Sequence, residues 1–378
     1  MNSSTVIKKK SIDFGLLIVV LLLMMFGVIM VFSASYYDTI TEMSNPYYYL
    51  LRVLLWFFAG LVLMFLITII PYRVYYVLAP YVLVFCIGLL LLIWTPLGKE
   101  AGGAIRWLDF GFIAFMPSEI GKIGSIMFVA WYYTKFSKYT RTPIRGVIPV
   151  YLLAILFFLL IYLQPNLSTA IIMCGIIIGM MFVAGIKWKH FGGMLVVSGI
   201  GLAILLVSRG GFHMQRITSF LDPLADPQGA SYQVIQSLLA LAAGGVFGTG
   251  PGNSIQKAQY LPEAQNDFIF AIIGEEYGFI GCMLILIVYI ILIWKGAMIA
   301  INAADKYGMM LASGVTILFA LQVTMNVAVV TSLMPPTGVI LPFISYGGSA
   351  MLVFAVAAGI LLNVSRYKKV EVKESKKE

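Results

Sequence analysis

The chain has 378 residues, of which 61% are hydrophobic and only 11% are charged. In a soluble globular domain roughly a quarter of the residues are charged. The composition therefore excludes a soluble globular domain and indicates a polytopic membrane protein. The formal charge of +9 does not indicate a nucleic-acid partner, because most basic residues lie in short loops and tails beside apolar runs.

The chain begins with a tail, residues 1–13, that contains Lys8, Lys9 and Lys10. The first apolar run, 14–32, is followed by small residues that resemble a signal-peptide cleavage site. The run is too long for a signal sequence, and further apolar runs follow at once. We therefore expect a retained first span whose amino end lies in the cytoplasm.

Ten apolar runs of about 20 residues are each long enough for a helix to cross a hydrocarbon core of about 30 Å. The expected spans are 14–32, 47–70, 74–95, 117–134, 147–164, 167–186, 191–208, 268–294, 308–331 and 346–364. The prediction is an all-α polytopic membrane domain, 14–364, with ten transmembrane helices.

An even number of spans puts both termini on one side of the membrane. Most of the 25 Lys and Arg residues then fall in the loops and tails assigned to the cytoplasm, which agrees with the positive-inside rule. The basic tail, 365–378, is expected to be a solvated, disordered cytoplasmic end.

Two loops assigned to the outer side are long and rich in Gly, Pro and polar residues. They are 96–116 and, between spans seven and eight, 209–266. Because long ordered loops usually carry function, we expect the chemistry to face outward. The glycine-rich stretch 244–253 lacks the Gly-Lys-Ser/Thr ending of a nucleotide-binding loop, so it predicts a tight turn.

Metal and disulfide frameworks are not expected. The three cysteines, Cys86, Cys174 and Cys282, all fall inside apolar runs, as small core residues do. The two histidines, His190 and His213, lie far apart in the sequence.

Glu119 and Lys122 lie near the outer start of the fourth span, three residues apart, so that they share one face of a helix. One interpretation is a structural ion pair. The other is that Lys122 lines an anion-binding cavity and Glu119 orients it, because ionisable residues inside spans are often functional. The sequence leaves both open.

Several cations belong to the outer side. Arg106 precedes Trp107 in the loop 96–116, while Arg209, Arg216 and Lys257 belong to the large loop. Single charges are usually just solvated, and Trp is common at the headgroup level. A convergence of such cations at a membrane mouth would instead suit a pyrophosphate-bearing lipid.

Asp267 stands where the large outer loop gives way to the eighth span. Asn266 or Asp267 is a candidate N-cap for the helix that follows, because a side-chain oxygen there satisfies free backbone donors. The alternative is a carboxylate held at the membrane mouth as a general base. Glu275 and Glu276, about two turns further, are expected to be buried in protein, one of them as partner to an outer cation.

Motifs along the whole membrane region resemble the SEDS family (shape, elongation, division and sporulation). The matching blocks are GAIRW at 103–107, PSEIGK at 117–122, QPNLST at 164–169, Gln215-Arg216, 232–237, GNSIQK at 252–257, 261–278 and LPFISYGG at 341–348. The sequences of 252–257 and 261–264 resemble those of the division and sporulation types of the family more than those of the elongation type.

The resemblance implies that Asp267 is the catalytic acid or base. It also implies a set of substrate-binding residues: Arg106, Trp107, Glu119, Lys122, Gln164, Gln215, Arg216, Asn253, Ser254, Gln256, Lys257, Glu263 and Ser345. The chain departs from the family pattern at Asn166, often Asp, and at Gln265-Asn266, often His-Thr. Asn166 cannot act as an acid or base, so a role in hydrogen bonding or backbone geometry is expected there.

The activity implied by the resemblance is polymerisation of lipid II by glycosyl transfer at the outer face of the cell membrane during division. The implied partners are a class B penicillin-binding protein and other divisome membrane proteins, at the division septum. No cofactor is assigned, although a divalent cation would suit the reaction. Two alternatives stay open: a lipid II flippase, and a scaffold without catalysis that recruits a transpeptidase.

Overall fold

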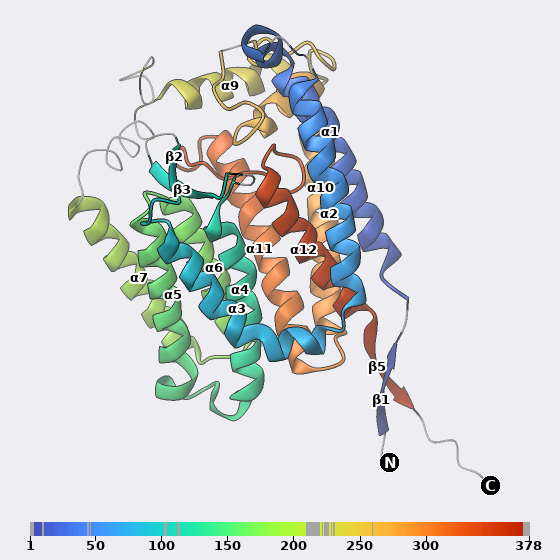
Figure 1. The fold of residues 1–378 in the computed structure, drawn as a ribbon, viewed down its shortest axis with the longest axis vertical. Coiled ribbons are helices and arrows are strands. Elements are labelled where there is room, and N and C mark those ends of the chain that lie inside the picture. The colour runs from blue at the N-terminus through green and yellow to red at the C-terminus, as the bar shows by residue number, and fades with distance from the viewer. Residues whose placement is uncertain are drawn as a thin grey trace.

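The computed structural model describes residues 4–372, except for 209–219, most of 221–230, and short gaps at 10, 44, 46, 102–103, 112–113 and 259. Its long helices run side by side as a bundle (Figure 1). They are α1 (Phe14–Met43), α2 (Tyr48–Ile69), α3 (Tyr72–Leu92), α4 (Pro117–Lys135), α5 (Ile148–Tyr162), α6 (Leu167–Val183), α7 (Trp188–Ser208), α10 (Ile269–Ile301), α11 (Lys306–Val330) and α12 (Gly348–Ser365).

A helix therefore stands at each of the ten expected spans. Eight of the described helices are long and apolar enough to cross a membrane; α4 and α6 are not among them. Helix α6 has 17 residues, and α4 carries the ionisable residues Glu119 and Lys122. The all-α polytopic membrane class is confirmed, while the number of spans stays a prediction.

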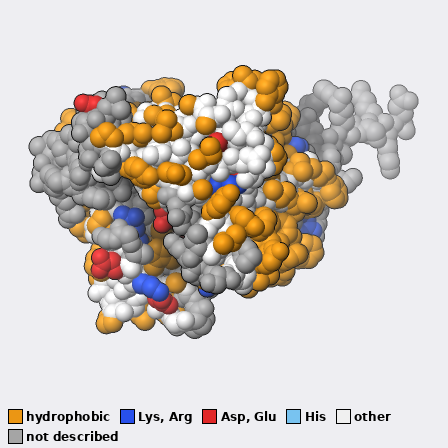
Figure 2. All heavy atoms as spheres, turned by 90° about the horizontal axis from the view of Figure 1, so that it is seen from above, with side chains coloured by type: hydrophobic (Ala, Val, Ile, Leu, Met, Phe, Trp, Pro, Cys, Tyr) orange, Lys and Arg blue, Asp and Glu red, His pale blue; other side chains and the backbone are white. Residues whose placement is uncertain are grey.

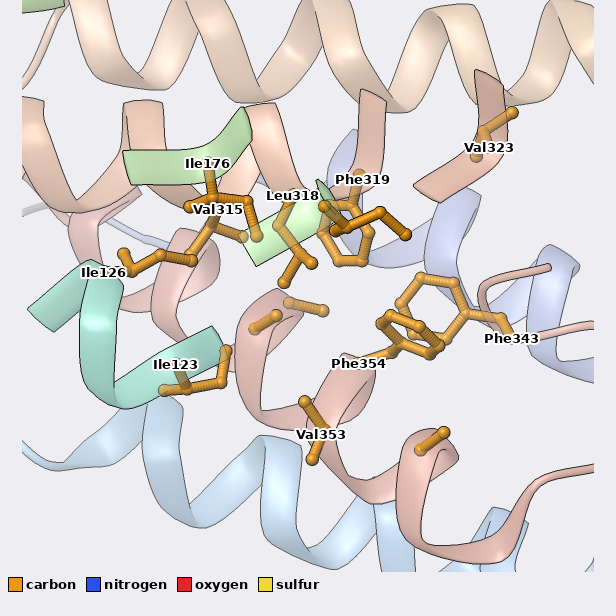
Figure 3. Packing of buried hydrophobic residues seen from close by; sticks show 14 of the residues in the cluster. Ile123, Ile126, Ile176, Val315, Leu318, Phe319, Val323, Phe343, Val353 and Phe354 are labelled. Atoms are coloured by element: carbon orange, nitrogen blue, oxygen red, sulfur yellow. The ribbon is translucent and has the colours of Figure 1, made fainter. Parts of the chain in front are cut away.

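The centre of the bundle is apolar and is built around α11 and α12. Figure 3 shows Phe319 of α11, Phe354 of α12 and Phe343 of the connecting loop turned toward one another. Their ring centroids lie 5.5 to 6.2 Å apart, the spacing of favourable aromatic pairs. The peripheral helices leave large apolar side chains exposed, as a lipid-facing surface requires.

Several elements were not expected from the sequence. The loop after α3 forms a three-stranded antiparallel sheet from β2 (Gly98–Ala101), β3 (Ala104–Asp109) and β4 (Ala114–Phe115). The large loop contains α9 (Tyr232–Gly244), and the short turns η1 (Ser137–Tyr139) and η2 (Pro143–Val147) precede α5.

The C-terminal tail, which was expected to be disordered, forms a strand over part of its length. Strand β1 (Ser4–Lys9) pairs antiparallel with β5 (Tyr367–Val372). Both termini lie at the same end of the molecule, opposite the small sheet and α9 (Figure 1). This agrees with an even number of crossings.

Helix α10 is broken near its outer end, and the break holds part of the large loop. Gly278 has φ 67° and ψ −166°, a conformation that suits glycine. The backbone N–H groups of Phe279 and Ile280 donate to the carbonyls of Gly245 and Val246, at 2.9 and 3.2 Å. The glycine-rich stretch thus packs into the helix as a turn, as its composition predicted.

Candidate active site

A cavity of about 1150 Å³ is lined in part by the small sheet and α9, which lie at the end of the bundle opposite the termini (Figure 1). Its walls come from α2, α4, α9, α11, the first turns of α6 and α12, the small sheet, the segment before α10 and the loop between α11 and α12. Seen from that end, charged side chains are few and lie in small groups among apolar ones (Figure 2). Its polar and charged lining includes Arg52, Arg106, Trp107, Asp109, Glu119, Gln233, Glu263, Asn266, Asp267 and Gln322.

Asp267 lies in the turn before α10 and lines this cavity half-buried. The helix begins at Ile269, its N-cap is Phe268, and no side chain caps that position. Neither Asn266 nor Asp267 therefore takes the N-cap position that one interpretation gave them. The Asp267 Oδ2 atom lies 3.0 Å from where a Cβ would stand on Gly338, so glycine at 338 leaves room for the carboxylate.

Arg106, on β3, lines the same cavity and is held by the turn between α5 and α6. Its Nε donates to the Gln164 carbonyl at 3.3 Å, and its Nη2 donates to the Pro165 carbonyl. Burial lowers the pKa of Arg106, and the negative charge of Asp267 opposes that shift. An arginine and a carboxylate thus share one cavity, and the carbonyls of Gln164 and Pro165 fix the guanidinium.

The turn that supports Arg106 explains two of the predicted residues. The Gln164 side chain is buried and donates through Nε2 to the Leu90 carbonyl, so it braces the turn and does not line the cavity. Asn166 is the N-cap of α6, and its side chain accepts a hydrogen bond from the Thr169 N–H. The expectation that Asn166 acts through hydrogen bonding and backbone geometry is confirmed.

Glu119 and Lys122 form a buried ion pair on α4, with 2.7 Å between Lys122 Nζ and Glu119 Oε1. Lys122 Nζ also donates to Gln322 Oε1 at 3.2 Å. Glu119 and Gln322 line the cavity, while Lys122 lies behind them. Oε2 of Glu119 is buried and accepts no hydrogen bond from the described residues. The ion pair is therefore observed, and the Glu119 carboxylate also faces the cavity, while a role of the pair in anion binding stays a prediction.

Lys257 is not at the cavity, contrary to expectation. Its ammonium pairs with Glu276 Oε1 at 2.7 Å and contacts Ser33 Oγ at 3.0 Å, and both charged side chains are buried. The neighbouring Glu275 carboxylate accepts hydrogen bonds from the Ser254 hydroxyl and the Ile255 N–H. The expected pairing of one α10 glutamate with an outer cation is thus observed.

Other predicted residues also lie away from the cavity lining. Asn253 is exposed and bonds to the Thr249 carbonyl, and the Gln256 N–H donates to the Glu275 carboxylate. Ser345 Oγ accepts from the Leu341 N–H inside the loop after α11. Of the predicted set, the structure brings Arg106, Trp107, Glu119, Glu263 and Asp267 together. Gln215 and Arg216, with Arg209, lie outside the described residues.

Arg52 was not predicted as a site residue, although it lines the cavity from α2. Its guanidinium lies 4.4 Å from the centre of the Tyr48 ring, and among the described residues no carboxylate pairs with it. A lone arginine at the start of an apolar run is the signal that would have identified it.

Carboxylates line the cavity at Asp109, Glu119, Glu263 and Asp267. Within the described part of the chain, no group of three or more His, Cys, Asp or Glu side chains is arranged to hold a metal ion.

Comparison with known proteins identifies the relatives of this chain. The FTSW_RODA_SPOVE family model, described as "Cell cycle protein", matches residues 14–370. Stage V sporulation protein E of Bacillus subtilis is 41% identical over 363 residues, covering 95% of this chain and 98% of that protein. A "Probable peptidoglycan glycosyltransferase FtsW" of a Geobacter species is 38% identical, covering 89% and 92%.

Solved structures of related proteins have the same fold as this chain. A chain from a peptidoglycan synthase complex, described as coordinating polymerization and crosslinking, superposes with a TM-score of 0.76 at 25% identity, covering 94% of this chain and 98% of that one. The rod shape determining protein RodA of Thermus thermophilus gives 0.68 at 25% identity, covering 94% and 97%. The chain therefore belongs to the FtsW, RodA and SpoVE family of cell cycle proteins, the SEDS family that its motifs indicated.

Proposed function

We propose that this chain is a membrane-embedded peptidoglycan glycosyltransferase that polymerises lipid II on the outer face of the cell membrane. The observation that carries the proposal is the Asp267 carboxylate on the wall of a cavity that also holds Arg106. The name of the Geobacter relative, a probable peptidoglycan glycosyltransferase, supports it.

The reaction needs a base near the attacking hydroxyl and positive charge near the leaving group. Asp267 takes the proton of the 4-hydroxyl of an incoming N-acetylglucosamine. The oxygen attacks the anomeric carbon of the N-acetylmuramic acid at the end of the growing chain, and the bond from that carbon to the pyrophosphate breaks. The departing undecaprenyl pyrophosphate carries the negative charge that develops.

Arg106 lines the same cavity as Asp267, and the charge of Asp267 acts on its guanidinium. Its fork of N–H donors suits the bidentate binding of phosphate, and its contacts with the turn after α5 fix its direction. Arg52 supplies a second positive charge on the α2 wall. Lys122, compensated by Glu119 at 2.7 Å, contributes less to the field at the leaving group.

The proposal extends to partners and place. The structural likeness to a chain of a complex that couples polymerization to crosslinking supports a class B penicillin-binding protein as partner. The similarity to an FtsW protein supports a role at the division septum, with other divisome membrane proteins. The similarity to a stage V sporulation protein makes the sporulation septum the alternative.

Reconstitution tests the proposal. The purified chain, alone and with a cognate class B penicillin-binding protein, is incubated with labelled lipid II in vesicles, and the glycan products are separated by size. We expect polymer from the wild type and none from Asp267→Asn. Labelled lipid II crossing the bilayer without polymer would support the flippase alternative, and neither activity the scaffold. Chelator in a parallel reaction tests for a divalent cation.

A further inference from the structure

Two amide side chains on α11 lie below the loop that joins α11 to α12. Gln322 and Asn326 are four residues apart and therefore share one face of the helix. Both are buried, with exposed fractions of 2% and 0%. Because burying an amide without hydrogen bonds costs free energy, the partners of these two side chains indicate what they do.

Both N–H donors of the Asn326 amide are used by backbone carbonyls. Nδ2 donates to the Asp267 carbonyl at 2.8 Å and to the Val339 carbonyl at 2.6 Å. The first partner is the backbone of the proposed base. The second follows Gly338, whose Cα faces the Asp267 carboxylate. One side chain thus fixes both the base and the wall opposite it.

The same loop is fixed at two further points. Gln322 donates through Nε2 to the Ile340 carbonyl at 3.1 Å, while its Oε1 accepts from Lys122. The Tyr346 N–H donates to the Gln265 carbonyl at 2.9 Å, two residues before Asp267. The loop and the segment that carries the base are therefore held together as one unit.

We infer that Asn326 is a positioning residue for Asp267. The inference rests on the proposed function. Asp267 lies in the turn before α10 and not inside the helix, so the hydrogen-bond pattern of the helix does not hold its backbone. A base on a turn needs supporting hydrogen bonds to hold its direction. Asn326 supplies one from a rigid helix and touches no reacting atom.

The test is the kinetics of Asn326→Ala in lipid II polymerisation. The change removes both donors, so we expect kcat to fall by about 10- to 100-fold, because small displacements of a catalytic group cost that much. The KM for lipid II should stay within about two-fold, because Arg106 and Arg52 are placed by other elements.

The chain offers a matched control in Asn363 on α12. It is also fully buried, and its Nδ2 donates to the carbonyls of Ile67 and Thr68, at 3.0 and 2.9 Å. These contacts lie at the end of the bundle near the termini, away from the cavity. Asn363→Ala should lose stability in the same way, while kcat per folded molecule stays at the wild-type value.

A second variant covers the case in which alanine at 326 prevents folding. Asn326→Asp keeps the shape of the side chain and removes the NH2 group, and its kcat per folded molecule should fall to a similar extent. Wild-type kcat in either folded variant would overturn the inference. An equal loss of kcat in Asn363→Ala, or a raised KM with unchanged kcat, would also overturn it.

Different results would reject the positioning role of Asn326 and the proposed function of the chain. If the wild type makes polymer and Asp267→Asn does not, while Asn326→Ala matches the wild type, only the positioning role is wrong. If the wild type makes no polymer under any of these conditions, the base and its support are both rejected.

Discussion

Replacing Glu119 by glutamine tests how strongly the buried charges of α4 depend on each other. The Lys122 side chain is 1% exposed and the Glu119 side chain 7% exposed, and their charged atoms lie 2.7 Å apart. The variant Glu119→Gln keeps the shape of the side chain but leaves the Lys122 ammonium with only neutral partners, Gln322 among them.

The magnitude follows from the distance. At an effective dielectric constant of about 20, unit charges 2.7 Å apart attract by roughly 6 kcal/mol. Much of this offsets the cost of removing both ions from water. Breaking such a pair from one side typically costs about 3–5 kcal/mol, because the remaining charge stays buried without compensation. The double variant Glu119→Gln with Lys122→Met should cost less than about 1 kcal/mol, because it buries no charge.

The assay is a denaturant titration of the four proteins of this double-mutant cycle in mixed micelles, which measures the free energy of unfolding. We expect the double variant to be more stable than Glu119→Gln alone. Two results would contradict a stabilising charge pair between Glu119 and Lys122. One is a Glu119→Gln variant that unfolds at the wild-type midpoint, and the other is a double variant that loses as much free energy of unfolding as Glu119→Gln.

Three further substitutions probe the cavity and its frame. Gly338→Ala would place a Cβ 3.0 Å from Asp267 Oδ2, so kcat should fall by about ten-fold while the melting temperature changes little; an unchanged kcat would contradict this contact. Arg106→Lys keeps the charge but loses the fork of donors, and kcat/KM should fall by at least about ten-fold, whereas a purely electrostatic role predicts near wild-type rates. Gly278→Ala meets a φ of 67° and places a Cβ against the backbone of Val246 and Gly248, so it should destabilise the protein by at least about 1–3 kcal/mol in the same titration; equal stability would show that the break in α10 relaxes.

The positions of the helices could be predicted because apolar runs of spanning length leave few other solutions in lipid. Their ends could not. Helix α1 continues past the predicted residue 32 to Met43, and α10 continues past 294 to Ile301. A helix satisfies its own backbone, so polar or mixed residues continue it where packing against elements distant in sequence favours the helix. The pairing of β1 with β5 is a long-range contact of the same kind.

The site was partly predictable. Arg106, Glu119 and Asp267 belong to distinctive motifs, and the structure brings these three segments to one cavity. Lys257 belongs to an equally distinctive motif but pairs with Glu276, because the break at Gly278 brings the loop against α10. No local sequence pattern shows whether Lys257 will pair with Glu275, with Glu276 or with neither.

Gln322 and Asn326 were not predicted as residues of the site, for a different reason. Each is an uncharged polar residue within a helix that is otherwise largely apolar, so neither changes the charge pattern from which the cations and carboxylates were selected. Their importance appears only when their partners are known, because a buried amide acts through whatever backbone lies opposite it.

In the proposed function, the Asp267 carboxylate acts as the base of glycosyl transfer. The most direct measurement is the single-turnover rate of lipid II polymerisation by the purified protein in vesicles, for the wild type and for Asp267→Asn, with the folded fraction matched by thermal unfolding. We expect the rate to fall by about 10²- to 10⁴-fold with substrate binding retained, the range expected for loss of a general base. Polymer formed by Asp267→Asn at the wild-type rate would contradict it.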